Sequence, residues 1–308
     1  MDRPTLQRAL DSVAAQDYPN IEIVVAAALG DAHRDLPPSC GAFPLRLVRS
    51  HLKLQRADAA NAALDAANGE WLNFLDDDDE LLPHHVSTMR AALDANPHAR
   101  LAHSQSEDVT AHGRFVRYHG VVFKPWRQLD TGFFHPHCAM FSRSLLDDGA
   151  RFDPRFEILE DMDFFVQCAQ YTPFAFVTQP TTRYYVDAGD SGAGAGANRN
   201  ELRLQSAIRV LRAKWAALET RLRASPEFRG EQALWLLDQR MIEPAAAIIA
   251  GLLSERPSSA DANGLAVLLS AARGESADAI GGAARWRDER FAIEDIAARL
   301  RAFGNTPS

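Results

Sequence analysis

The sequence has few cysteines and lacks a run of apolar residues long enough to span a membrane. Its three cysteines, Cys40, Cys138 and Cys168, include no C-x-x-C pair, which argues against a zinc site or a disulfide framework and favours a reduced setting. The most apolar stretch, residues 245–253, is far shorter than the ~20 residues that span a bilayer. The first residues lack a signal-peptide pattern. We therefore expect a cytoplasmic protein with at most peripheral association, at the inner face of the membrane.

An excess of positive charge is also lacking. The 308 residues include 33 Lys and Arg and 41 Asp and Glu, giving a net charge of −8. Because a general nucleic-acid binder needs a basic face for the phosphates, we expect no nucleic-acid partner. Apolar residues make up 46% of the chain, which is typical of folded proteins and exceeds what disordered chains contain.

The first 200 residues alternate strand and helix patterns. Apolar runs with β-branched residues predict buried strands at 21–27, 45–48 and 71–75. Residues 57–67 and 83–93 predict helices. This order predicts an α/β domain over residues 1–200, with a mainly parallel, Rossmann-like sheet and flanking helices.

Residues 201–308 carry almost only helical patterns, so we expect an all-helical C-terminal region. Ala245 and Ala279 lie 34 residues apart, Pro257 falls where a repeat would close, and Ala233 suits a small position in a first helix. This weakly resembles tetratricopeptide helical pairs, whose period is ~34 residues. In so alanine-rich a chain, a plain helical bundle is an equally good interpretation.

Four consecutive carboxylates, Asp76–Asp79, follow directly after the predicted strand 71–75. Open α/β sheets bind ligands outside the carboxyl ends of their strands. Adjacent carboxylates repel one another, and a hard divalent cation with oxygen ligands relieves this. In an extended segment Asp76 and Asp78 point to the same side, which makes them candidate ligands of a metal that bridges nucleotide phosphates. For an isolated acidic run, a solvated turn would be the better interpretation.

Several motifs in order resemble family 2 glycosyltransferases of the GT-A fold. Residues 69–79, Gly-Glu-Trp-Leu-Asn-Phe-Leu-Asp-Asp-Asp-Asp, are similar to the signature A-x-G-E-(apolar)-x-F-L-D-x-D-D. Residues 6–25 are similar to the family's opening helix and second strand, and residues 56–63 to its R-x-x-A-x-N-x-G helix. Residues 149–154 and 160–164 are similar to G-x-F-D-x…E-D-x-D-(aromatic). The resemblance does not extend to the C-terminal helices.

The resemblance implies inverting, metal-dependent transfer of a sugar from a nucleotide-diphosphate donor to a hydroxyl of a glycan, lipid-linked glycan or protein. Its cofactor would be Mn²⁺ or Mg²⁺. By resemblance, Asp78 is the main metal ligand, and Asp76 assists near the ribose or the metal. Asp161 is the general base, and Glu160 binds the acceptor or positions the base. The implied donor-binding residues are Arg56, Asp76, Asp77 and Asp78.

These roles make geometric predictions. We expect Asp76 and Asp78 at the end of a central strand that faces an open crevice. We expect Asp161 across that crevice, with its pKa raised by repulsion from Glu160. Acidic residues also favour the first turn of a helix through its dipole, and this structural role is compatible with the catalytic one.

Three departures from the family pattern leave part of this interpretation open. The family's opening strand is missing before Pro4, for which a native start further upstream is the favoured explanation. Residues 26–31 replace a D-D-G-S motif whose acid contacts the base, so the nucleotide is undetermined. Asp187 stands where many relatives have a metal-binding histidine.

The departures motivate an alternative, a catalytically lapsed GT-A-like scaffold whose helical region binds a partner. His135 and His137 also allow two interpretations: contacts to acceptor or phosphate, or ordinary loop and core histidines.

Overall fold

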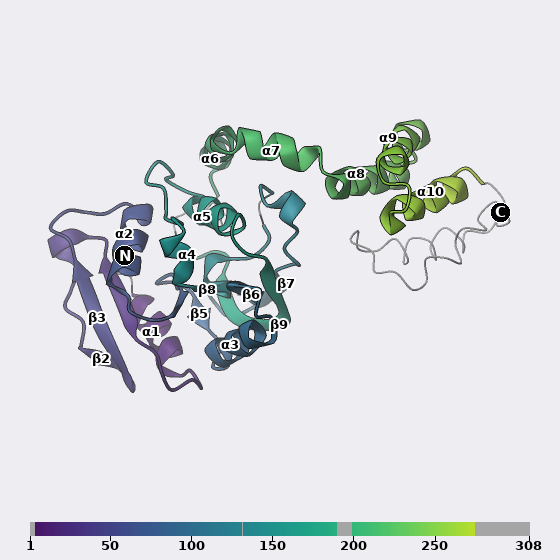
Figure 1. The fold of residues 1–308 in the computed structure, drawn as a ribbon. Helices are drawn as coiled ribbons and strands as arrows, with labels where there is room; N and C mark the ends of the chain where they lie inside the picture. The colour runs from purple at the N-terminus through teal and green to yellow at the C-terminus, as the bar shows by residue number, and fades with distance from the viewer. Residues whose placement is uncertain (1–3, 131, 190–198, 275–308) are drawn as a thin grey trace. The chain divides into compact units, whose positions relative to one another are not determined.

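The chain folds into two compact units, one ending at Trp215 and the other beginning at Ala216 (Figure 1). The computed structural model describes residues 4–130, 132–189 and 199–274. The first unit contains all the strands that are described, and it also includes helix α6 (Glu201–Lys214). The α/β fold with additional helices predicted from the sequence is therefore confirmed, and α6 belongs with the α/β unit.

The smaller of two sheets has the strand order β1-β3-β2. Strand β1 (Ile23–Ala27) runs parallel to β3 (Phe43–Arg49), and β2 (Ser39–Cys40) runs antiparallel to it. Helix α1 (Leu6–Ala14) places its leucines at helical spacing, so that one face is apolar. That face packs on the sheet in a cluster formed by Leu6, Leu10, Ile23, Phe43 and Leu45.

The larger sheet has six strands in the order β4-β8-β6-β9-β5, with β7 paired to β6. Its strands are β4 (Trp71–Asn73), β5 (Glu80–Leu81), β6 (Leu101–Val109), β7 (Phe115–His119), β8 (Ala139–Ser142) and β9 (Phe174–Tyr185). Strands β6 and β9 are parallel, whereas the β4/β8, β6/β8, β5/β9 and β6/β7 pairs are antiparallel.

The prediction of a mainly parallel sheet is wrong, because the strand pairing is mixed. The connection between β6 and β7 shows one reason. Thr110 N–H donates to Arg114 O at 2.9 Å, closing a tight hairpin. Such a short connection joins antiparallel strands, since a parallel pair needs a long crossover.

Helices cover both faces of the larger sheet (Figure 1). Met89 and Leu93 of α3 (His85–Ala95) pack with Ala102 and Met140 on one face. On the other face, Leu101 and Phe141 pack with residues of α5 (Glu160–Cys168) and α4 (Ser144–Asp147). Neighbouring strand residues alternate between the two clusters, as the two-residue period of a strand requires.

Strand β4 lies at an edge of the larger sheet and not at its centre. In the part of the chain that the structure describes, β4 pairs with β8 alone and β1 pairs with β3 alone. The prediction that the acidic residues follow a central strand is therefore wrong. The starts of β4 and β1 are nevertheless joined, because Glu22 accepts hydrogen bonds from Asn68 N–H and Gly69 N–H.

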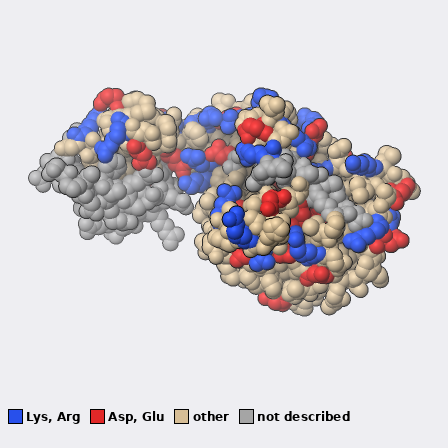
Figure 2. Space-filling model, turned by 180° about the vertical axis from the view of Figure 1, so that it is seen from behind, with Lys and Arg blue, Asp and Glu red and all other residues tan. Residues whose placement is uncertain are grey.

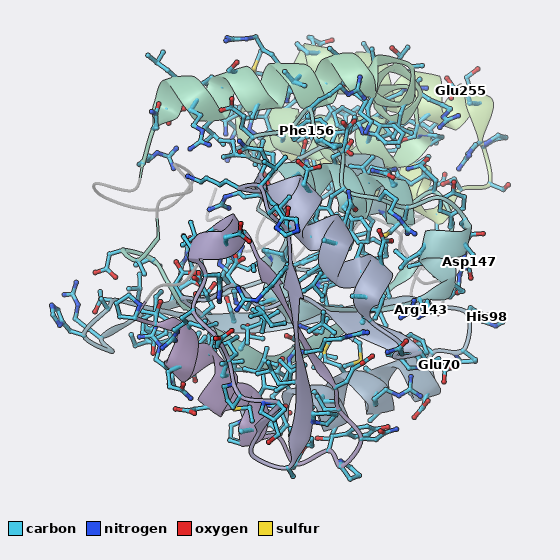
Figure 3. The ribbon with its side chains drawn as sticks, turned by 90° about the vertical axis from the view of Figure 1, so that its left-hand side faces the viewer. Glu70, His98, Arg143, Asp147, Phe156 and Glu255 are labelled. Carbon is cyan, nitrogen blue, oxygen red and sulfur yellow. The ribbon has the colours of Figure 1, made fainter. Side chains whose placement is uncertain are left out.

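The start of β4 is also tied to the end of β8 by Arg143. Its N–H donates to Glu70 O at 2.9 Å, and its side chain donates to the backbone oxygens of Gly69 and Ala67. Figure 3 shows Glu70 and Arg143 side by side. Since Ala67 is the C-cap of α2 (Arg56–Ala66), Arg143 links that helix to the larger sheet.

The second unit is helical throughout its described residues. Its helices are α7 (Ala216–Arg223), α8 (Pro226–Asp238), α9 (Ile242–Glu255) and α10 (Ala260–Ala272). Ala233 and Ala245 are fully buried where α8 and α9 pack, in a cluster completed by leucines of α10. The tetratricopeptide pairing stays a prediction, because Ala279 lies outside the described residues.

Candidate active site

The acidic residues after β4 form a turn. Asp79 N–H donates to Asp76 O at 3.3 Å, which brings the two ends of the tetrad together. Carboxylate oxygens of Asp76, Asp78 and Asp79 all lie within 4.8 Å of one another. Asp79 therefore joins Asp76 and Asp78, the two metal ligands predicted from the sequence. The prediction that Asp76 and Asp78 lie in an extended segment is wrong, because the four residues form a turn. Asp77 is not one of the three converging residues.

Asp79 is held by Tyr185, the last residue of β9, and by His137, which lies just before β8. Its Oδ1 accepts from Tyr185 N–H at 3.0 Å, and its Oδ2 lies 3.2 Å from His137 Nδ1. Both side chains are almost completely buried. Burial opposes protonation of His137, but the Asp79 carboxylate beside it raises the imidazole pKa well above its ordinary value. A charged histidine therefore fixes the innermost carboxylate of the turn.

Helix α1 fixes the outer part of the turn through Arg8. The guanidinium donates to Asp78 O at 2.6 Å and lies 3.2 Å from Glu80 Oε1. It also stacks over the Tyr185 ring at 3.8 Å. These contacts hold the backbone of Asp78 so that its carboxylate has a defined direction.

A second pair of carboxylates begins α5. Glu160 and Asp161 are the first two residues of this helix, and Leu159 before them has a left-handed φ of 63°. Such a conformation is uncommon for a branched residue and recurs at functional sites. Met162 N–H donates to Asp161 Oδ1 at 2.8 Å, so Asp161 also has the structural role in the first helical turn considered from the sequence.

The two acidic groups converge on Arg56, the first residue of α2. Arg56 Nη1 lies 3.7 Å from Glu160 Oε1. Burial raises the pKa values of Asp76, Glu160 and Asp161, and the charge of this guanidinium opposes that rise at all three. The charge of Asp76 also acts on Glu160. The fold therefore brings the predicted donor residues and the predicted base within electrostatic reach of one another.

Burial sets the protonation of these carboxyl groups. It raises the pKa of Glu160 to about 7 and raises the pKa of Asp161 as well. Asp161 repulsion further raises the pKa of Glu160. The pKa of Asp161 is raised as predicted, but the cause is burial and not the predicted repulsion from Glu160. The side chain of Asp76 is open to solvent, yet enough protein surrounds its carboxyl group that desolvation raises its pKa.

The converging carboxylates fit a divalent cation. Three oxygen donors within 4.8 Å match the hard ligands that Mg²⁺ and Mn²⁺ prefer. The neighbour Asp79 raises the pKa of Asp76 by repulsion that a cation would relieve. Asp187, considered as a further ligand, instead accepts from Ala111 N–H at 2.6 Å and is outside this cluster.

The chain is similar to known proteins in sequence and in fold. The sequence model of glycosyl transferase family 2 matches residues 2–149. Residues 2–149 are a family 2 glycosyltransferase domain. The domain carries β4, the acidic turn and Arg56, whereas Glu160 and Asp161 lie beyond the matched residues.

Two relatives match a longer segment than the family 2 domain. An uncharacterized glycosyltransferase of Bacillus subtilis, YwdF, is 25% identical over 211 residues, covering 64% of this chain and 76% of that protein. The uncharacterized protein y4gI of Sinorhizobium fredii is 26% identical over 205 residues, which are 64% of this chain. The match spans 22% of y4gI, so this chain corresponds to a small part of that protein.

Solved structures share the fold at low sequence identity. Staphylococcus aureus TarS 1-349 in complex with UDP-GlcNAc has a TM-score of 0.54 at 17% identity, covering 89% of this chain and 84% of that one. The mannosyltransferase PcManGT of Pyrobaculum calidifontis in complex with GDP-Man and Mn²⁺ has a TM-score of 0.50 at 20% identity, covering 88% and 82%. These likenesses support the GT-A-type architecture.

The surface adds two observations. Across the described ranges, every helix is too short or too polar to cross a bilayer. Acidic and basic side chains are interspersed on the face seen in Figure 2.

Proposed function

We propose that this protein is a metal-dependent, inverting glycosyltransferase. It would move a sugar from a nucleotide-diphosphate donor to a hydroxyl of a glycan, lipid-linked glycan or protein. The observation that carries the proposal is the convergence of the turn Asp76–Asp79 and the pair Glu160–Asp161 on Arg56. A cytoplasmic location, at the inner face of the membrane for a lipid-linked acceptor, accompanies this proposal.

Donor binding is assigned to the acidic turn and to Arg56. Asp78 and Asp76 would hold the cation, with Asp79 completing the oxygen set from its fixed position beside His137. When bound, Mn²⁺ or Mg²⁺ would supply the positive charge that stabilises the departing nucleotide diphosphate. Arg56, at the start of α2, would bring a further positive charge to the same anion. Asp77, the remaining predicted donor-binding residue, lies in the acidic turn between Asp76 and Asp78.

Asp161 is assigned as the general base. Its carboxylate would take the proton of the acceptor hydroxyl while that oxygen forms a bond to the anomeric carbon. The bond from that carbon to the diphosphate oxygen breaks, and its electron pair leaves with the nucleotide. Attack from the face opposite to the leaving group inverts the anomeric configuration. Glu160 would position the acceptor or the base, since it joins Asp161 to Arg56.

Calorimetric titration tests the donor half of the proposal. UDP-GlcNAc and GDP-mannose, the donors named for the two structural neighbours, serve as probes with Mn²⁺, with Mg²⁺ and with EDTA. We expect metal-dependent binding of at least one donor, weakened about tenfold or more in Asp78→Asn. Asp147→Asn is the matched control, because Asp147 is exposed at the end of α4 (Figure 3) and should bind like the parent protein.

Release of nucleotide diphosphate tests the enzymatic half. The parent protein with metal should release nucleotide slowly from the donor that it binds, by transfer to water. A folded protein that binds no nucleotide sugar and releases no nucleotide would contradict the proposal and favour the lapsed scaffold.

A further inference from the structure

A second group of potential metal ligands lies on the larger sheet, at residues that the proposed reaction does not use. Side-chain ligand atoms of Asp108, His119 and His135 lie within 4.8 Å of one another. Asp108 is on β6 and His119 ends β7, whereas His135 precedes β8. In the β6/β7 ladder Ser106 pairs with His119 and Asp108 with Arg117, so Asp108 and His119 are diagonal neighbours on one face.

We propose that Asp108, His119 and His135 form a second cation site, selective for Zn²⁺ or another transition ion that prefers imidazole. His135 Nε2 lies 3.1 Å from Asp108 Oδ1. Two ligands about 2.0–2.1 Å from a tetrahedral zinc ion lie about 3.3–3.4 Å apart, so this hydrogen-bonded pair would need to separate by only a few tenths of an ångström to share a metal. Two imidazoles and one carboxylate suit Zn²⁺ and related ions better than Mg²⁺.

The surroundings hold Asp108 in the orientation that a metal needs. Its side chain is completely buried, and Arg117 Nε donates to Oδ2 at 2.9 Å. Ser106 Oγ donates to Asp108 Oδ1 at 2.8 Å. The same oxygen also contacts His135 Nε2, and this second position on Oδ1 is the one that a metal ion would take. Outer hydrogen bonds of this kind orient the ligands of protein metal sites.

Aromatic packing holds the His135 ring. It stacks on Tyr184 with ring centroids 3.9 Å apart and on His137 at 5.6 Å. The His119 ring lies at 4.5 Å and is tilted relative to it. His137 belongs to the Asp79 contact, so the two cation sites would be separate but adjacent. His135 is also one of the charges that act on Asp161, which places the second site within electrostatic reach of the proposed base.

The test separates the two sites by mutation and uses Co²⁺ and Zn²⁺ alone as probes. In Asp76→Asn/Asp78→Asn protein, which lacks the first site, we expect one equivalent of Zn²⁺ to bind by calorimetry. Co²⁺ should give a visible d–d absorption band typical of nitrogen and oxygen ligands. Adding His119→Gln to this background should abolish the band and weaken Zn²⁺ binding about tenfold or more.

His112→Ala is the matched control, because His112 is an exposed histidine in the same β6/β7 hairpin. It should leave the band and the stoichiometry unchanged. If His119→Gln unfolds the protein, as judged by circular dichroism, His135→Gln replaces it. Absence of the Co²⁺ band in the Asp76→Asn/Asp78→Asn protein, or its persistence in both histidine variants, would overturn the proposal.

Discussion

Asp161 is half-buried and accepts a hydrogen bond from its own helix, and both features bear on its proposed role. Replacing it with Asn keeps the shape of the side chain and the hydrogen bond from Met162 N–H but removes the proton acceptor. We expect the rate of sugar transfer in Asp161→Asn to fall by about 10²–10⁴-fold, the usual contribution of a general base. Donor binding measured by calorimetry should be retained. Transfer at the parent rate would rule out Asp161 as the base.

The acid limb of the pH–rate profile tests the carboxylate pair. A base must be ionised, and burial raises the pKa values of both groups, to about 7 for Glu160. The transfer rate should therefore fall as the pH drops below about 7. Because the two carboxyl groups interact, the apparent pKa values of this fall belong to the pair and not to either residue. Glu160→Gln removes one titrating carboxyl group and its repulsion of the Asp161 carboxylate. The acid limb of the profile should therefore move to lower pH.

Glu157→Gln is the matched control for this profile, since Glu157 is largely exposed and precedes the same helix. Its acid limb should coincide with that of the parent protein. A Glu160→Gln profile identical to the parent profile would show that Glu160 does not set the limb.

At the residue scale, sequence reasoning found the carboxylates but not what holds them. Asp76, Asp78, Glu160 and Asp161 stand in motifs that can be read locally. The part played by Asp79 depends on a turn and on His137, which is 58 positions further along the chain. The sequence shows the four consecutive aspartates and the His-Pro-His segment at 135–137, but nothing in it specifies that Asp79 and His137 lie in contact.

Among elements, helix α6 is attached to α5 by a buried ionic contact. Asp163 is completely buried, and its carboxylate accepts from Lys214 Nζ at 2.7 Å, from Trp215 Nε1 at 2.8 Å and from Gln167 Nε2 at 2.8 Å. Lys214 also lies 2.7 Å from Asp153 and 5.5 Å from the ring of Phe156, which Figure 3 labels. This contact explains why α6 belongs to the first unit.

Removing the Lys214 charge should destabilise the first unit. In Lys214→Met the buried Asp163 loses its cationic partner, and breaking a buried ion pair typically costs about 3–5 kcal/mol. We expect a loss near the lower end of that range, because Trp215 and Gln167 still donate. Urea denaturation measures it, with Arg209→Met as the control at an exposed position of the same helix. Equal midpoints for the two variants would contradict this assignment.

Long amphipathic or alanine-rich elements were predictable, and short exposed strands were not. Helices α2 and α3 lie within two residues of their predicted bounds. Strand β7 was missed because its side chains are exposed and show no apolar alternation. Strand β9 is hard to predict as one continuous strand, because polar residues and Pro180 interrupt its apolar pattern where the ladder to β6 shifts register.

For the whole molecule, the division into two compact units predicts two unfolding transitions. Leu268 is completely buried in the cluster formed by α8, α9 and α10. Leu268→Ala should destabilise the second unit by about 2–5 kcal/mol. We expect calorimetry to show one transition moved to lower temperature, with the other transition and donor binding unchanged. A common shift of all transitions would show that the units unfold together.

The single-sided pairing of β1 has a consequence for amide hydrogen exchange. Neighbouring residues of a strand direct their N–H groups to opposite sides. Since β1 pairs with β3 alone in the described chain, its amide protons should alternate between slow and fast exchange along residues 23–27. At 101–103, β6 lies between β8 and β9, so successive amides there should all exchange slowly. Uniformly slow exchange along β1 would mean that its open side is covered in solution.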